Sequence, residues 1–169
     1  VLDNHDLALV SGWYSGTIIN NELAAEIEQI TPQLTLFRDV GAPVIVYGET
    51  YETVQNRQER PLAIRPKLTD FDVFAYGRRL TALAEHCADF GVPLTFHHHM
   101  CTAVESEAEL DQLMNHTGEA VNLLLDTGHL LFAGGDNAAV ITKHGPRINH
   151  VHTKDIRTDV LASIDKQSR

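Results

Sequence analysis

Histidines and carboxylates gather at the ends of several apolar runs in this sequence. The chain contains ten histidines, and six of them follow short hydrophobic stretches: His97, His98, His99, His129, His150 and His152. Imidazole is the commonest protein ligand for transition metals, so this clustering favours a metal site. Two carboxylates and one histidine would suit a divalent ion of the manganese, cobalt or iron type, with positions left open for substrate and water.

Three residues are candidate ligands for such an ion: Glu105, Asp126 and His152. They lie in the loops after three successive predicted strands, so each could present one oxygen or nitrogen towards a common point. Thiolate coordination is not expected. The alternative is that all three are ordinary polar residues at the rim of a sheet, hydrogen-bonded to one another, and their spacing alone leaves both interpretations open.

The elements that would position these residues are short buried strands. The apolar run 121–125 delivers Asp126 and His129 just beyond its end. A parallel strand covered on both faces appears as such a continuous hydrophobic run, and ligand-binding groups follow its carboxyl end. Taken alone, the run also fits a strand followed by a simple turn. Similar runs predict further strands at 7–10, 44–47, 94–96 and 148–151.

Helical patterns separate these strands. Residues 71–90 carry an amphipathic repeat that ends at Gly91, and Ser106 with Glu109 forms a capping-box start for another helix. Asp136 is a candidate N-cap for a short helix ended by Gly145.

Two other stretches lack a continuous helical pattern. The segment from residue 21 to Gly41 is expected to break at Thr31-Pro32 and to start again, because proline suits the first turn of a helix. Residues 50–70 have no clear periodicity, which predicts a long loop, either a functional lid or a disordered insert.

The alternation of strand and helix predicts a parallel α/β fold. An open doubly wound sheet and a (β/α) barrel both remain compatible with it. Gly-x-Gly-x-x-Gly and Gly-x-x-x-x-Gly-Lys-Ser/Thr are absent, and polar residues follow every strand, which favours the barrel. Such barrels need about 250 residues, so the 169 residues here are expected to form one partial TIM barrel domain, 1–169.

Composition excludes several classes of partner. The net charge of −10 without a cluster of lysine and arginine argues against nucleic acid. No apolar run approaches a membrane span and the first residues lack the layout of a signal peptide, so a cytoplasmic protein without a membrane partner is expected. Cys87 and Cys101 do not suggest a disulfide scaffold.

Three motifs carry a resemblance to a known family. His97-His98-His99-Met100, L-L-D-T-G-H at 124–129 and H-V-H-T-K-D at 150–155 resemble the inosose dehydratases of the xylose isomerase-like barrel superfamily. The last two motifs are shared widely in the superfamily, whereas the triple histidine ahead of a glutamate points to the dehydratases. The resemblance implies a (β/α)8 TIM barrel of which this chain holds about strands 3 to 7, without the final glutamate ligand on the eighth strand.

The resemblance also implies roles for particular residues. Glu105, Asp126 and His152 match metal-ligand positions, with manganese or cobalt as the expected cofactor. Residues expected to move protons are Lys154, His97 and His99, and those expected to contact substrate are Trp13, Glu49, His129 and Asp155. Cys101 stands where similar sequences usually have glycine. It could narrow the loop or place a metal-reactive thiol near the site.

The reaction implied by the resemblance is the loss of water from 2-keto-myo-inositol (scyllo-inosose), giving a trihydroxycyclohexane-1,2-dione in inositol catabolism. A ketose epimerase or isomerase on the same metal barrel is the alternative, because enediolate chemistry is common to both. A non-catalytic sugar-binding fragment is a third interpretation. In each case the expected partner is a small cyclitol or sugar, and a homo-oligomer is left open.

Overall fold

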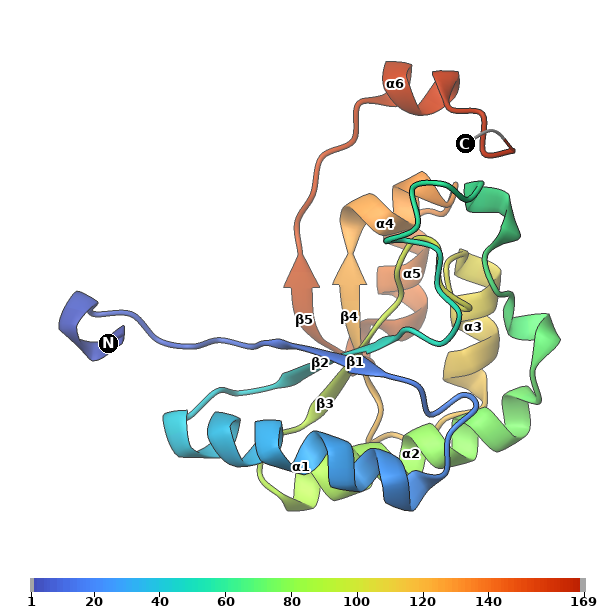
Figure 1. Cartoon of the computed structure of the whole chain (residues 1–169). Coiled ribbons are helices and arrows are strands. Elements are labelled where there is room, and N and C mark those ends of the chain that lie inside the picture. The colour runs from blue at the N-terminus through green and yellow to red at the C-terminus, as the bar shows by residue number, and fades with distance from the viewer. Residues whose placement is uncertain (1, 168–169) are drawn as a thin grey trace.

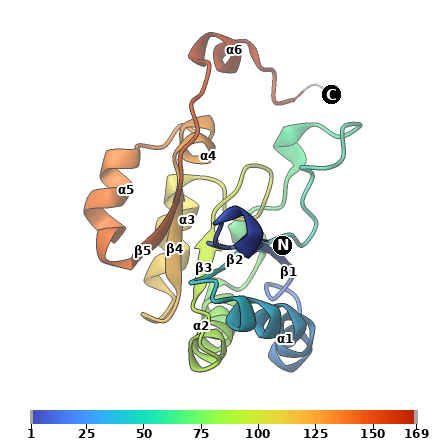
Figure 2. The ribbon, with the colours of Figure 1, turned by 90° about the vertical axis from the view of Figure 1, so that its left-hand side faces the viewer.

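A computed structural model describes residues 2–167 as a parallel sheet wrapped by helices (Figure 1). The five strands are β1 (Trp13–Gly16), β2 (Ile45–Glu49), β3 (Leu94–His97), β4 (Asn122–Asp126) and β5 (Ile148–His152). They pair in the order β1-β2-β3-β4-β5, and every pair is parallel. Figure 2 shows this order across the sheet, from β5 to β1.

The helices are α1 (Leu23–Val40), α2 (Val73–Asp89), α3 (Glu107–Asn115), α4 (Thr127–Phe132), α5 (Asn137–His144) and α6 (Thr158–Ser163). Helices α1 to α5 lie between successive strands in the chain, and α6 follows the last strand. Short 3-10 turns occur at Leu2–His5, Leu62–Ile64, Leu68–Asp70 and Gly145–Arg147. Within residues 2–167, no helix is long and apolar enough to cross a membrane.

The strand order decides between the two architectures that the sequence leaves open. A doubly wound sheet reverses its strand order at a switch point, whereas here each strand pairs with its neighbour in sequence. Repeated crossovers in one direction generate the curved wall of a barrel. Within the described residues, β1 pairs only with β2 and β5 only with β4, so the sheet is an open arc. The predicted barrel fragment is therefore confirmed.

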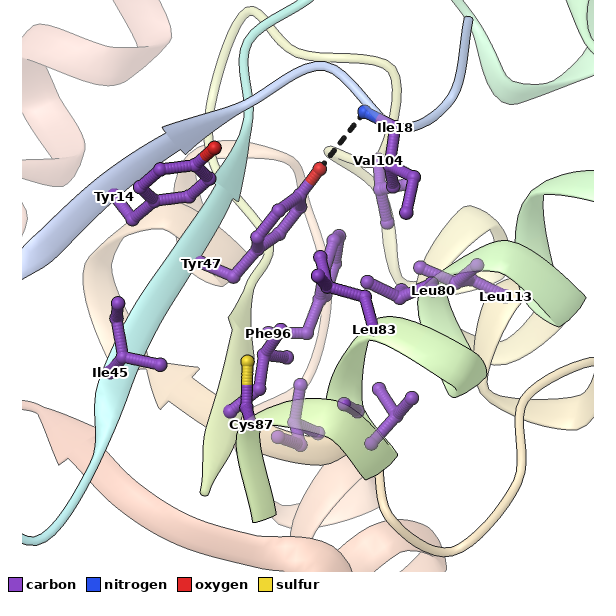
Figure 3. Packing of buried hydrophobic residues seen from close by; sticks show 14 of the residues in the cluster. Tyr14, Ile18, Ile45, Tyr47, Leu80, Leu83, Cys87, Phe96, Val104 and Leu113 are labelled. Carbon is purple, nitrogen blue, oxygen red and sulfur yellow. Dashed lines mark hydrogen bonds between the residues drawn. The ribbon is translucent and has the colours of Figure 1, made fainter. Parts of the chain in front are cut away.

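The hydrophobic core lies between this arc and the helices. Tyr47 and Phe96 of the sheet stack with ring centroids 6.3 Å apart, and Leu80 and Leu83 of α2 belong to the same buried cluster (Figure 3). Burying each such side chain stabilises the fold by about 1.5–3 kcal/mol. The Tyr47 hydroxyl accepts a hydrogen bond from the Ile18 backbone N–H at 3.1 Å, which ties the loop after β1 to the core.

The first strand lies later in the chain than its apolar pattern predicts. Residues 7–10 are irregular, and β1 begins at Trp13, directly after Gly12, and ends at Gly16. Both glycines allow close packing. A Cβ at Gly12 would lie 2.3 Å from the Phe37 ring, and one at Gly16 would lie 2.1 Å from the Tyr47 ring.

Helix α1 continues through Pro32, so the predicted break at this residue is wrong. Pro32 is exposed, while Ile30, Leu34 and Phe37 on the inner face are buried on both sides of it. The Thr31 hydroxyl also donates to the Ile27 carbonyl at 2.6 Å. Continuous burial of one face outweighs the helix interruption that proline favours in isolation.

Other sequence signals agree with the structure. Ser106 and Glu109 form the predicted capping box of α3, and Asp136 caps α5. Helix α2 fills the predicted stretch 71–90, with Asp72 as its N-cap. Residues 50–70 form a long loop that contains only two 3-10 turns.

Candidate active site

Asp126 is the centre of a cluster of histidines at the carboxyl ends of the strands. It is fully buried at the end of β4. Its Oδ1 accepts hydrogen bonds from the backbone N–H groups of Gly128 at 3.1 Å and His129 at 2.9 Å, which caps α4. Its Oδ2 is left to face side chains from three neighbouring elements.

Four side chains approach Asp126 Oδ2. His97 Nε2 and His152 Nδ1 each lie 3.4 Å away, and His129 Nε2 lies 3.9 Å away. The Lys154 ammonium contacts the same oxygen directly. Strands β3 and β5 flank β4 in the sheet, so residues distant in sequence converge because parallel strands end at one edge.

His97 has a defined tautomer. Its Nδ1 lies 2.5 Å from the His98 carbonyl oxygen, which can only accept, so Nδ1 carries the hydrogen. Burial lowers the pKa of His97 to about 4, and the neutral ring therefore turns the lone pair of Nε2 towards Asp126. Two acceptors that face each other in this way favour a cation between them.

The residues His97, Asp126 and His129 can hold a metal ion, because one ligand atom from each lies within 4.8 Å of the other two. Their imidazole nitrogens and carboxylate oxygen suit a divalent transition metal. Burial lowers the pKa of His129 to about 3, which keeps this ring neutral and available as a ligand at neutral pH. The donor set therefore fits a divalent metal.

The predicted ligand set overlaps this group only in part. The structure brings Asp126 and His152 together. The Glu105 carboxylate instead accepts a hydrogen bond from the Cys101 N–H at 2.6 Å and pairs with Arg65 Nε at 3.3 Å. Glu105 as a ligand stays a prediction.

Arg65 fixes the long loop on the rest of the site. Besides contacting Glu105, Arg65 donates from its Nη2 to both oxygens of the Glu109 carboxylate, at 3.1 and 3.0 Å. It also donates to the Thr102 carbonyl at 3.0 Å. Hydrogen bonds between charged groups are shorter and stronger than those between neutral ones, so these contacts hold the loop in place. Sequence reasoning missed Arg65, since nothing in the aperiodic stretch 50–70 indicates which charge pairs inward.

Lys154 reaches Asp126 because its backbone lies close to the start of α4. Lys154 N–H donates to the Thr127 hydroxyl at 2.9 Å, and this hydroxyl donates in turn to the Lys154 carbonyl at 2.9 Å. A Cβ at Gly128 would stand 2.6 Å from the Lys154 Cβ, so glycine is needed for this approach. Partial burial lowers the Lys154 pKa below its ordinary value.

Trp13 and His99 lie beside the histidine cluster. The Trp13 ring lies 5.6 Å from the His97 ring and 5.8 Å from the His99 ring. The indole covers Gly48, where a Cβ would lie 1.9 Å from the ring. The His99 Nδ1 donates to the Met100 carbonyl at 2.8 Å, and burial lowers the pKa of His99 to about 4. His99 is therefore neutral at pH 7.

Two predicted substrate residues stand apart from the cluster in their contacts. Glu49 is buried, and its carboxylate accepts from the backbone N–H groups of Ile19 and Tyr51, each at 3.0 Å. Burial raises the Glu49 pKa to about 8. Asp155 is exposed and accepts from the Ile156 N–H at 2.9 Å. Their roles towards substrate stay predictions.

Comparison with known sequences gives matches over nearly the whole chain. The xylose isomerase-like TIM barrel family matches residues 1–167. The rhizopine catabolism protein MocC of Rhizobium meliloti is 50% identical over 161 residues, which are 95% of this chain and 50% of that protein. An inosose dehydratase of Halalkalibacterium halodurans is 32% identical over 169 residues, 99% of this chain and 56% of that protein. The chain thus spans about half the length of these relatives.

Solved structures show the same fold. A xylose isomerase-like TIM barrel protein from Mycobacterium smegmatis, in complex with magnesium, is similar with a TM-score of 0.66 and 17% sequence identity. The similarity covers 95% of this chain and 56% of that chain.

Proposed function

Since the chain belongs to the xylose isomerase-like TIM barrel family, we propose that it is the central part of a metal-dependent hydro-lyase. The substrate we propose is 2-keto-myo-inositol, which loses water to give a trihydroxycyclohexane-1,2-dione. The observation that carries this proposal is the convergence of three histidines and Lys154 on Asp126. The names of the relatives, an inosose dehydratase and a rhizopine catabolism protein, support the choice of reaction.

The ion would be held by Asp126 together with His97 and His129, whose ligand atoms lie close together. His152 is the neighbouring ligand candidate on β5, and Glu105 is the predicted one on the loop after β3. We propose manganese or cobalt as the ion; the similar Mycobacterium smegmatis protein contains magnesium. When bound, the ion supplies Lewis-acid polarisation of the substrate carbonyl.

Lys154 would take the proton from the carbon beside the ketone. Its lowered pKa increases the fraction of neutral amine that can act as a base. The proton would pass from carbon to the Lys154 amine while the electron pair moves towards the carbonyl oxygen. The pair would then return to form the new carbon–carbon double bond as hydroxide departs from the next carbon. The Lys154 ammonium would return that proton to the departing hydroxide, so that water is released, because the neutral His97 and His99 rings already donate their N–H groups to backbone carbonyls.

Substrate would lie against the open mouth of the arc. Trp13, 39% exposed, offers the indole face to the C–H face of a cyclitol ring. A binding site for a small molecule needs few polar groups, because the positions of these groups fix the orientation of the ligand and give specificity.

The test is the ultraviolet absorbance of the enolised dione formed from 2-keto-myo-inositol by the metal-loaded intact protein. We expect the absorbance to rise with time and to disappear after treatment with a chelator. Conversion of the substrate into an epimer without a change in absorbance would favour the epimerase alternative. No conversion by the metal-loaded protein would contradict both.

A further inference from the structure

His98 contacts two residues of the cluster around Asp126 without being a ligand candidate itself. It directly follows β3 and is fully buried. Its ring Nε2 accepts a hydrogen bond from the Asp126 backbone N–H at 3.3 Å. Its backbone carbonyl oxygen lies 2.5 Å from Nδ1 of His97. The contacts of this one residue therefore reach both the carboxylate and a histidine of the proposed metal site.

The contact with Asp126 lies beyond the point where β3 and β4 stop pairing. The last residues in register on these strands are His97 and Leu124, and Asp126 stands two positions further along β4. Its backbone N–H donates to the His98 ring, while its Oδ1 accepts two N–H groups from the start of α4. Because the main chain and one carboxylate oxygen are both held, the direction of Oδ2 is fixed.

This hydrogen bond also defines the tautomer of His98. A backbone N–H donates only to a ring nitrogen without a hydrogen, so the ring is neutral and its hydrogen is on Nδ1. This Nδ1 is buried and has no hydrogen-bond partner among residues 2–167. A buried donor without a partner costs stability, which an apolar side chain at the same place would not. Packing alone therefore does not explain a histidine here, whereas the acceptor that it offers to Asp126 does.

The carbonyl of His98 acts on the neighbouring ring. His97 Nδ1 donates to this carbonyl, which leaves the lone pair of His97 Nε2 facing Asp126 Oδ2 at 3.4 Å. Histidines that bind metals are commonly oriented by a hydrogen bond from their other ring nitrogen. His98 thus holds one ligand candidate through its side chain and the other through its backbone.

We propose that His98 is a positioning residue for the metal site, whose ring holds the backbone of Asp126 so that Oδ2 is directed at the ion. Its carbonyl holds His97 in the tautomer that binds a metal. This inference deepens the proposed function and rests on it for the presence of a divalent ion. Loss of contacts behind metal ligands typically weakens metal binding about 10–100-fold, and we expect an effect of this size.

The experiment is a titration of the intact protein with Co²⁺ alone, in competition with a coloured chelator. His98→Gln places an amide oxygen near the position of Nε2, and His98→Met has a similar length and shape but no strong acceptor. We expect the Kd for Co²⁺ to rise about 10–100-fold in His98→Met and to stay closer to that of the unmodified protein in His98→Gln. The visible absorbance of bound Co²⁺ reports its coordination geometry and should change more in the methionine variant.

A matched control is His86→Met. His86 lies on α2, and its ring lies beside Phe90 with centroids 6.1 Å apart. Its Nε2 is also buried without a hydrogen-bond partner in the part of the chain that the structure describes. This variant makes the same change outside the cluster and should bind Co²⁺ as the unmodified protein does. Equal Kd values for His98→Met and His98→Gln would overturn the inference, because the acceptor would then not matter.

A second measurement does not depend on the folding of any variant. Long-range ¹H–¹⁵N correlation spectra of the metal-free intact protein, labelled at histidine and aspartate, distinguish the two tautomers of each ring. For His98 we expect the hydrogen on Nδ1, together with a scalar coupling across the hydrogen bond between Nε2 and the Asp126 amide nitrogen. A hydrogen on Nε2 of His98 would overturn the inference, since this nitrogen could not accept the Asp126 N–H.

These outcomes separate the inference from the proposed function. Normal dione formation together with an unchanged Kd for Co²⁺ in His98→Met would overturn the inference and leave the reaction standing. Co²⁺ binding that depends on the His98 acceptor, without dione formation by the unmodified protein, would contradict the reaction alone. Failure of the unmodified protein to bind Co²⁺ would contradict the metal site and therefore both proposals.

Discussion

At the scale of single residues, Asp126 links folding and chemistry through its two oxygens. Oδ1 is used by the backbone at the start of α4, whereas Oδ2 faces the histidines and Lys154. A substitution can therefore remove the charge without removing the cap, since asparagine is also a good N-cap.

We expect Asp126→Asn and Asp126→Ala both to lose bound metal, because the negative ligand is gone. The alanine variant should also lose about 1 kcal/mol of stability with the cap, while the asparagine variant should lose less. Metal analysis of the intact protein and urea unfolding measure the two effects. Stoichiometric metal in Asp126→Asn would contradict the assignment of this carboxylate.

Lys154 is the residue whose loss should separate metal binding from turnover. Lys154→Met removes the ammonium next to Asp126, so metal should be retained or bound more tightly. Turnover should fall by at least about 100-fold if the amine moves a proton. Metal titration and the dione assay check this, and unchanged turnover would exclude Lys154 from catalysis.

At the scale of elements, the loop after β3 adopts a conformation that suits glycine. Cys101 has a φ of +68°, in the left-handed region, where a side chain costs about 1–2 kcal/mol. Its side chain is nonetheless buried. Its N–H donates to the Glu105 carboxylate, and its carbonyl accepts from the Thr53 hydroxyl. The thiol does not belong to the group of ligand atoms around Asp126, so packing accounts for it better than metal chemistry.

The backbone effect at Cys101 can be isolated by two small substitutions. Cys101→Ala and Cys101→Gly both remove the thiol, but only glycine relieves the strain. We expect the glycine variant to be more stable than the alanine variant by about 1 kcal/mol, measured by urea unfolding. Equal or reversed stabilities would show that the loop bears no strain at this residue.

At the scale of the whole molecule, the buried histidines make stability depend on pH. Burial lowers the pKa of His97 and His99 to about 4, and of His98 and His129 to about 3. In the unfolded chain these histidines have pKa values of about 6.5. Between these values the folded state binds fewer protons than the unfolded state. The free energy of unfolding is therefore highest above about pH 6.5 and declines as the pH falls towards 4.

We expect the free energy of unfolding of the metal-free chain to be lower at pH 5 than at pH 7. Each buried histidine can contribute up to about 1.4 kcal/mol per pH unit in this window. Urea titrations in the presence of a chelator measure the difference. Equal free energies at the two pH values would mean that these rings are not held neutral by burial.

The molecule as a whole is an arc of five strands, and this shapes its chemistry. The ends of β3, β4 and β5 bring the histidines to Asp126, while β1 supplies Trp13. Both edge strands have a free side within the described residues. Related proteins are about twice as long. The assays above should therefore be carried out on the complete barrel.

The sequence by itself determined the fold class and the residues at the strand ends. Covered strands must be apolar, and caps such as Ser106 and Asp136 act locally, so both leave a pattern that can be read in one dimension. The same locality explains the errors at Pro32 and at residues 7–10, where packing against distant groups overrides the local preference. Gly12 and Gly16, for example, make room for the rings of Phe37 and Tyr47.

Only the tertiary structure decided which of the strand-end residues meet. Sequence spacing could not show that His97 and His152 share one oxygen of Asp126, or that Glu105 pairs with Arg65. These contacts join residues tens of positions apart and depend on side-chain direction as well as on order in the chain. The physical reason is that a hydrogen bond or metal site requires atoms within a few ångströms, which the folded sheet sets and the sequence pattern does not.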